Sequence, residues 1–411
     1  MSKLQELRFD WERLSAQANA LNDKYPMGTS MPKAEADKLE NILGQLERVN
    51  AELVVEKNST NKLASTWKNE DGQDVRILRN AADFRAHYEG LEQPLRGQDA
   101  PKLGDFLRGV AGMRTTTAVQ NALSVGTDSA GGYNVPSLVM PGILEALVPA
   151  SSLLTAGAGI VPLAEGAKTF TTAAIDTIPT AAWRNEAGAI AMSDPAFRAV
   201  VAAPKSLAFY FKVSRELLAD ATNLDSALTV AIAAAFAKEL DRAGLMGTGT
   251  APEPRGILNT TNVSSVTNGT NGASLATNKF ANLFSGVQAI LQNDAPMPNA
   301  VICSPRTKVG LASLADSTGQ PMRVPDMLAP LPVISTSQIS NTLTVGTSTD
   351  CTQIYMGDFT KLAFMMRERM SIQLATELFA GTGEVGFFCH VRADVAVMYP
   401  KAFAVVTGVR P

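Results

Sequence analysis

The chain has 411 residues and a formal net charge of −3, with 36 basic and 39 acidic residues. Tight phosphate binding needs clustered Lys and Arg side chains, so this balance argues against a protein that grips nucleic acid. The charge is unevenly spread, because the first 121 residues hold 17 of the basic and 18 of the acidic residues. A charged front is thus joined to a weakly charged body, which has few ionisable groups for enzyme chemistry and ample surface for packing against copies of itself.

Two runs in the charged front show the alternating three- and four-residue spacing of apolar side chains that coiled coils use. Pro26 and Gly28 interrupt the helical pattern between the two runs. The pattern predicts either a helical hairpin that buries its own seam or a coiled coil that joins several chains. The predicted seam residues are Leu4, Leu7, Trp11, Leu14, Leu21, Leu39, Ile42, Leu46, Val49 and Leu53.

The front ends in a segment with weak periodicity. Proline and glycine residues recur through 93–117, which predicts a linker that a protease can reach. The sequence DSAGG at 128–132 then predicts an extended, turn-rich arm.

Two strand-like runs, 168–174 and 197–202, flank a polar stretch that contains Trp183. They predict a two-stranded excursion within 160–205. Isolated hairpins are only marginally stable in water. We therefore expect this one to lie against a partner.

The clearest helical pattern of the body follows Asn223. Its alanine content predicts a long, closely packed spine helix, which Gly244 and Gly247 end. The residues predicted to lie on one face of this helix are Leu228, Ile232, Ala235, Glu239 and Leu240.

Near the C-terminus, apolar and polar residues alternate, which predicts a half-buried strand. One expected face points outward and carries His390, Arg392 and Asp394. The other is expected to be buried and consists of Phe387, Cys389, Val391, Ala393, Val395 and Val397.

No pattern in the sequence is typical of an active site. The two histidines, His87 and His390, belong to no zinc or triad motif. The glycine-rich turn at 247–252 lacks the lysine and the following helix of a phosphate-binding loop. Glu368 and Glu377 are explained as solvated strand charges. We therefore expect no catalytic residue, no metal ion and no cofactor.

Other features argue against secretion and against a membrane protein. The N-terminus has no apolar signal region, and no apolar run is long enough to cross a bilayer. The cysteines are far apart and odd in number, which predicts reduced thiols in a cytosolic protein. They are Cys303, Cys351 and Cys389.

Five segments carry a resemblance to a known family when they are read in order. They are DSAGGYNVP at 128–136, AWRNEAG at 182–188, LDRAGLMGTGTAPEPRGIL at 240–258, SPR through LADSTGQP at 304–321, and RADVAVMYPKAF at 392–403. Together they resemble the major capsid proteins of tailed bacteriophages, with the Hong Kong 97-type fold. They are similar, in order, to the start of the mature N-terminal arm, the tip of the extended loop, the end of the spine helix, the axial domain and the closing strands.

The resemblance implies an α+β capsid fold preceded by a helical coiled-coil scaffolding (delta) domain. A phage protease is expected to remove that domain by a cut near Asn121 and Ala122. The implied organisation is a scaffolding domain over 1–121, an N-terminal arm over 122–150, an extended loop with its flanks over 151–205, a peripheral domain with the spine helix over 206–255, an axial domain over 256–352, and closing strands of the peripheral and axial domains over 353–411.

The implied function is structural. Subunits would form pentamers and hexamers of an icosahedral head around double-stranded DNA, assembled in the host cytoplasm and retained in the virion. Expected partners are copies of the chain, a portal protein, a prohead protease and, as an option, a decoration protein. Packaged DNA would be enclosed without tight specific binding, and no membrane partner is expected. Residues expected at contacts between subunits are Tyr133, Trp183, Arg184 and Glu186.

Alternative functions remain at this point. An encapsulin-like nanocompartment would use the same fold, although the long charged front favours a phage shell. A protease fusion or another enzyme is disfavoured by the lack of nucleophile motifs. A coiled-coil adaptor would leave the body unexplained.

Some members of the family join neighbouring subunits covalently through a Lys, an Asn and a catalytic Glu. The Lys position falls within 189–192, where the sequence has no Lys. The Asn and Glu positions fall at Gly383 and His390, and Lys168 lies elsewhere on the loop without such partners. We therefore expect no covalent crosslinking.

Overall fold

The computed structural model describes residues 13, 77–88, 103–111, 115, 119, 132–134, 140–163, 169–177, 183, 196–220, 224–316, 318–367, 370–375 and 379–411. The chain divides into two units, Met1–Val75 and Arg76–Pro411. Apart from Arg13, every described residue belongs to the second unit. All the predicted seam residues lie outside the described residues, and so do Asn121, Ala122, Arg184 and Glu186.

The first sheet of the second unit has six strands. Five follow the order β1-β13-β14-β12-β2, and β5 pairs with β14 off this path. The long strand β14 is antiparallel to β5, β12 and β13, whereas β2 runs parallel to β12. The strands are β1 (Gly132–Asn134), β2 (Gly159–Leu163), β5 (Lys205–Ser214), β12 (Leu362–Arg367), β13 (Ser371–Ala375) and β14 (Glu384–Val397).

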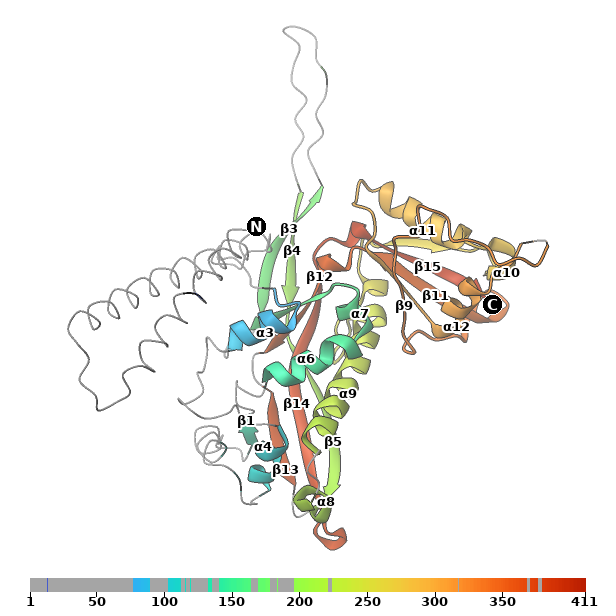
Figure 1. Cartoon of the computed structure of the whole chain (residues 1–411). Helices are drawn as coiled ribbons and strands as arrows, with labels where there is room; N and C mark the ends of the chain where they lie inside the picture. Colours follow the sequence, from blue (N-terminus) through green and yellow to red (C-terminus); the bar gives the residue numbers. More distant parts are fainter. Residues whose placement is uncertain are drawn as a thin grey trace. The chain divides into compact units, whose positions relative to one another are not determined.

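Helices cover this sheet. In the 23-residue helix α9, the Phe236 ring meets the Phe209 ring of β5 edge to face, with centroids 4.9 Å apart. Helices α4 and α6 pack against α9, and α3 packs against α6 (Figure 1). The helices of this part are α3 (Ala81–Tyr88), α4 (Leu103–Val110), α6 (Met140–Ala150), α7 (Ser152–Thr155), α8 (Arg215–Asp220) and α9 (Leu224–Met246).

The second sheet has seven strands. Five follow the order β6-β15-β11-β8-β9, while β10 pairs with β11 and β7 pairs with β15. Helix α11 packs on β15, and Gly286 of α11 leaves room for Met356, whose sulfur would lie 2.2 Å from an added Cβ. The strands are β6 (Ser264–Thr267), β7 (Ala273–Ser274), β8 (Ala300–Cys303), β9 (Val333–Ser335), β10 (Leu343–Val345), β11 (Ser348–Gly357) and β15 (Phe403–Arg410).

Short helices complete this second part. Ser304 caps α12, because its hydroxyl accepts a hydrogen bond from the Thr307 amide, as expected for a serine directly before a helix. The remaining helices are α10 (Leu275–Asn278), α11 (Ala281–Leu291) and α12 (Pro305–Ala312), with 3-10 turns η1 (Ile257–Asn259), η2 (Phe359–Lys361), η3 (Ala380–Thr382) and η4 (Pro400–Ala402).

The predicted α+β class and both predicted strands of the excursion are confirmed. β3 (Phe170–Thr177) and β4 (Ala196–Ala202) pair antiparallel as a separate two-stranded sheet. The turn predicted after the spine helix is confirmed as well, with Gly249 at φ +76 and its amide donating to the Pro254 carbonyl.

The predicted face of the spine helix is partly wrong. Ile232 and Leu240 are buried, but Ala235 is exposed, and Phe236 and Ala237 are buried in its place. Small residues of α9 itself occur on every side of the helix. The spacing of its apolar residues in the sequence therefore does not identify which face is buried. Gly244 does not end α9 but lies inside it, where an added Cβ would meet Leu153 at 2.5 Å.

The predicted linker over 93–117 is also wrong in part. Residues 103–110 form helix α4. The apolar residues of α4 follow one another at steps of three, one and three positions, which is the pattern of a helix packed on a core. The glycines of the segment obscure this pattern in the sequence. The buried side chains that make this pattern are Leu103, Phe106, Leu107 and Val110.

Candidate assembly surfaces and a charged pocket

The β3–β4 hairpin presents a surface that the described chain leaves in solvent. Trp183, between the two strands, has a relative exposure of 105%. Val201 of β4 is 59% exposed. At the base of the hairpin, the Arg198 guanidinium donates to the Val397 carbonyl at 3.3 Å, and β4 contacts β14. Apolar side chains in this setting fit a contact with another chain.

The predicted arm begins within the first sheet. Tyr133 pairs through its backbone with Ile372 of β13, and β1 forms an edge of the sheet. The structure describes no side chain for Tyr133, so its place at a subunit contact stays a prediction. Tyr133 belongs to the first sheet, whereas Trp183 lies between the two strands of the separate β3–β4 sheet.

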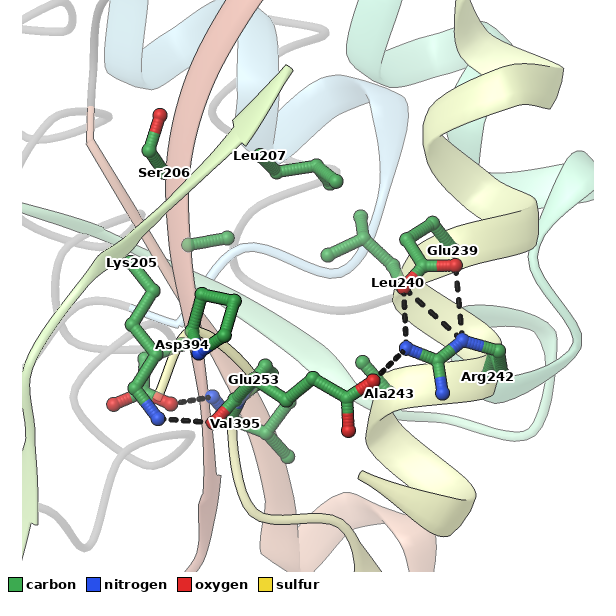
Figure 2. Close-up of a pocket in the computed structure, with 13 residues that line it drawn as sticks. Lys205, Ser206, Leu207, Glu239, Leu240, Arg242, Ala243, Glu253, Asp394 and Val395 are labelled. Carbon is green, nitrogen blue, oxygen red and sulfur yellow. Dashed lines mark hydrogen bonds and ion pairs between the residues drawn. The ribbon is translucent and has the colours of Figure 1, made fainter. Parts of the chain in front are cut away.

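Charged side chains meet in a pocket of about 250 Å³ between β5, α9, the turn at 252–254 and β14. Figure 2 shows the Arg242 guanidinium between the carboxylates of Glu239 and Glu253, at 2.6 and 2.7 Å. The Lys205 ammonium donates to the backbone carbonyl of Glu253. The sequence analysis missed this cluster, although the spacing of Glu239 and Arg242 is that of an ion pair on a helix.

The pKa shifts in this pocket follow from the pairing. Hydrogen bonds from Arg242, and then from Thr248, hold the pKa of Glu253 below its usual range. The hydrogen bond to Glu239 is the main reason that the pKa of Arg242 is raised. The ion pairs of Arg242 with Glu239 and Glu253 therefore fasten the turn at 252–254 to α9.

The alternating pattern of β14 predicted that Asp394 points outward, and this prediction is wrong. Its side chain is buried rather than outward, because the chain between β4 and β5 covers it. The Ala203 amide donates to one carboxylate oxygen at 2.7 Å, and the Val395 amide donates to the other at 2.8 Å. Burial raises the pKa of Asp394, and these hydrogen bonds only partly oppose it. The predicted buried face of β14 is confirmed, and on the predicted outward face Arg392 is exposed and His390 is half-buried.

A second buried carboxylate, Asp241 of α9, also went unpredicted. It accepts hydrogen bonds from the hydroxyls of Ser151 and Ser152 at 2.6 and 2.8 Å. It also accepts from the amides of Ser152 and Leu153 at 2.7 and 3.2 Å. Burial raises the pKa of Asp241 despite these four donors. Its partners belong to the start of α7, so Asp241 anchors that helix to α9.

Several other groups have a structural role. All three cysteines are buried and free, as the sequence predicts. Burial raises the pKa of both Cys303 and Cys389 to about 12, so neither thiol is ionised near neutral pH. A hollow of about 520 Å³ beside α11 and α12 is lined by apolar side chains, with Lys308 and Arg323 as its charged members.

The described residues include neither a metal-binding cluster nor a membrane-spanning helix. Within these ranges, no group of three or more His, Cys, Asp or Glu side chains is placed to hold a metal ion. Among the described helices, none is both long enough and apolar enough to cross a bilayer.

Comparisons with known proteins agree with this architecture. In solved structures, the chain is similar to the capsid of an empty GTA particle, with a TM-score of 0.50 and 19% identity over 63% of this chain and 90% of that one. The capsid of the native GTA particle gives a TM-score of 0.49 and 18% identity, again over 63% and 90%. A chain from Mycobacterium phage Adephagia gives 0.46 and 16% identity, over 64% and 90%.

Searches by sequence give the family. A comparison with curated protein sequences found no match. The sequence pattern of the phage capsid family, in contrast, matches residues 131–408, which include the hairpin, the spine helix, most of both sheets and the charged pocket. This chain belongs to the phage capsid family.

Proposed function

We propose that this structural shell protein is the major subunit of a phage head, and that its copies form pentamers and hexamers of an icosahedral container for double-stranded DNA. The observation that carries the proposal is the β3–β4 hairpin, which holds the fully exposed Trp183 away from the core of its own chain. A contact of this kind repeats around a ring when subunits associate head to tail. Many modest contacts per subunit then stabilise a closed shell through avidity.

The chemistry of the described residues supports a structural role rather than a catalytic one. In the pocket of Figure 2, the carboxylates of Glu239 and Glu253 are paired with Arg242. Asp394 is held by backbone amides, and the raised pKa values of Cys303 and Cys389 keep these two buried thiols protonated near neutral pH. These groups brace elements against one another. The comparisons give no support to an encapsulin-like compartment.

We also propose that the charged front scaffolds assembly and that a prohead protease cuts it off near Asn121 and Ala122. The support is the break in charge density and the apolar seams predicted for 4–21 and 39–53. A portal protein, a decoration protein and the packaged DNA are the further partners of this proposal. The weakly acidic composition supports DNA that is enclosed without being gripped.

Electron microscopy of the purified full-length chain tests the proposed function. We expect closed shells from the wild type. Trp183→Ala should impair shell formation without changing the thermal unfolding midpoint of the subunit, because the indole makes no buried contact in its own chain. A wild-type chain that stays monomeric at every concentration would contradict the proposal. Unchanged assembly of the variant would remove Trp183 from it.

The proposed cut has a separate test. Mass spectrometry of mature particles should find a body that begins within residues 111–124. A full-length subunit as the only form in mature particles would show that the front is not removed.

A further inference from the structure

Two described stretches of the charged front, both within the second unit, are packed into the body. We call residues 77–88 and 103–111 the docked segment. Leu78, Phe84, Phe106 and Leu107 each have 0% relative exposure. They belong to the same buried apolar cluster as Leu153 of α7. By composition the docked segment is part of the front, but by packing it is part of the core.

The first attachment of the docked segment is a strand-like bridge to the edge of the first sheet. The Leu78 amide donates to the Ile160 carbonyl, and the Ile160 amide donates to the Leu78 carbonyl, both at 2.8 Å. Ile160 belongs to β2, the last strand in the sheet order. The neighbouring Gly159 makes room for this contact, because an added Cβ would lie 2.2 Å from Ile77 Cγ2.

The second attachment is made by the two helices of the docked segment. Helix α4 turns its apolar face to the core and packs on α9, and the Arg108 Nε donates to the Leu218 carbonyl at 2.8 Å. Helix α3 packs on α6, where the Arg85 guanidinium binds both carboxylate oxygens of Glu145, at 2.5 and 2.8 Å. The Arg85 side chain is 63% exposed, so this ion pair sets orientation more than it adds stability.

We propose that the docked segment stays bound to the body after the chain is cut near residue 121, as a non-covalent part of the subunit. This inference rests on the cut that belongs to the proposed function. Cutting the chain removes the covalent link but leaves the buried side chains, the strand bridge and the helix contacts in place. Withdrawal of the segment would return four fully buried apolar side chains to water and would uncover the faces of α6 and α9 that they cover. The surface formed by β2, α6 and α9 is thus a binding site for a peptide, and its ligand is the docked segment of the same chain.

An engineered cut tests this directly on the full-length chain. Residues 112–118 are replaced by the recognition sequence of a site-specific protease, and the purified, unassembled protein is cleaved. Native size-exclusion chromatography followed by a denaturing gel then shows where the N-terminal fragment elutes. We expect the fragment and the body to co-elute at equal molar amounts. Separate elution of the fragment would overturn the proposal.

Two variants show whether retention comes from the docked segment or from residues 1–75. Phe106→Ala combined with Leu107→Ala removes buried side chains of α4, and Gly159→Val blocks Ile77 without touching α4. Each should speed dissociation of the cleaved fragment by at least about tenfold. Gly142→Ala in α6 is the matched control, because nothing lies within 4 Å of its added Cβ, and it should leave retention unchanged. Full retention in both test variants would overturn the proposal.

The thermal unfolding midpoint of each uncleaved variant shows whether the body has folded. Retention is measured on unassembled chains with an engineered cut. Failure of the chain to form shells, or absence of a natural cut, would contradict the proposed function and would leave this result unaffected.

Discussion

Two buried carboxylates show how residues of this chain are used for support. Asp241 accepts four hydrogen bonds from residues at the start of α7. Asp394 accepts hydrogen bonds from two backbone amides, one of which belongs to the turn into β5. In both cases burial is the largest influence on the carboxyl group and raises its pKa. A site designed for proton transfer would aim such a group at a substrate. Here the donors are serine hydroxyls and backbone amides for Asp241, and backbone amides for Asp394.

The raised pKa of Asp394 predicts a pH-dependent stability. The folded chain holds this proton to a higher pH than the unfolded chain, whose value is near 3.8. The folded state therefore binds more protons above pH 3.8, and the free energy of unfolding falls as the pH rises through the folded pKa. The slope for one proton is at most about 1.4 kcal/mol per pH unit.

Asp394→Asn should lack this contribution. The stability difference between wild type and Asp394→Asn should therefore shrink as the pH rises from 4 toward 7, as measured by urea denaturation. Asp326→Asn is the control, because the Asp326 side chain is 91% exposed, and its difference from wild type should stay near zero. A gap that widens with pH for Asp394→Asn would contradict the assignment.

At the scale of elements, close approach of helices depends on glycine in α9. Gly244 lets α7 and β12 come near, since an added Cβ would lie 2.5 Å from Leu153 and 3.4 Å from Phe364. Both neighbours are fully buried and have little space to move. At position 244, the steric cost of an added methyl group therefore outweighs the favourable helix propensity of alanine.

Gly244→Ala and Gly142→Ala should change stability in opposite directions. The first gains about 1 kcal/mol of helix propensity but costs about 1–3 kcal/mol in overpacking, so we expect a net loss of up to about 2 kcal/mol. The second enters open space in α6 and should gain about 0.4–1 kcal/mol. Urea denaturation of both variants measures the two values. Equal effects of the two substitutions would show that packing at Gly244 has been misjudged.

The sequence predicts elements well where one face differs strongly from the other. The alternation over residues 387–393 of β14 and the two strands around Trp183 are such cases. The prediction from sequence fails in α9, because alanine lies on several faces of that helix and hides which face is buried. Ala235 is exposed there, and Phe236 is buried. It fails in α4 because glycine breaks the apparent pattern, although four apolar positions still carry the helical spacing. The contacts of Asp241 and Asp394 depend on residues distant in sequence, which no local pattern reveals.

For the whole molecule, the family resemblance adds what local patterns cannot. The family and the α+β fold follow from ordered segments spread over most of the body, and residues 131–408 match the family. The boundary between front and body does not follow from composition. The charge density changes near residue 121, whereas the compact unit begins at Arg76.

Shells of this protein should contain no covalent bonds between subunits. The sequence has no Lys at 189–192, and the family resemblance implies that Gly383 and His390 stand where crosslinking members have Asn and Glu. Particles that are boiled and reduced should therefore run as monomers on a denaturing gel. A ladder of oligomers would contradict this expectation and would direct attention to Lys168.

The packing boundary predicts different outcomes for two truncated chains. A chain that begins at residue 76 keeps the docked segment, so its urea midpoint should equal that of the full-length chain. A chain that begins at residue 122 lacks Leu78, Phe84, Phe106 and Leu107, which are fully buried. It should lose at least about 3 kcal/mol of stability, comparable to a large truncation in a core, and should bind a dye that reports exposed apolar surface. Equal urea midpoints for the two truncated chains would show that the docked segment contributes nothing to the core. If neither truncated chain folds, residues 1–75 are needed for folding of the body.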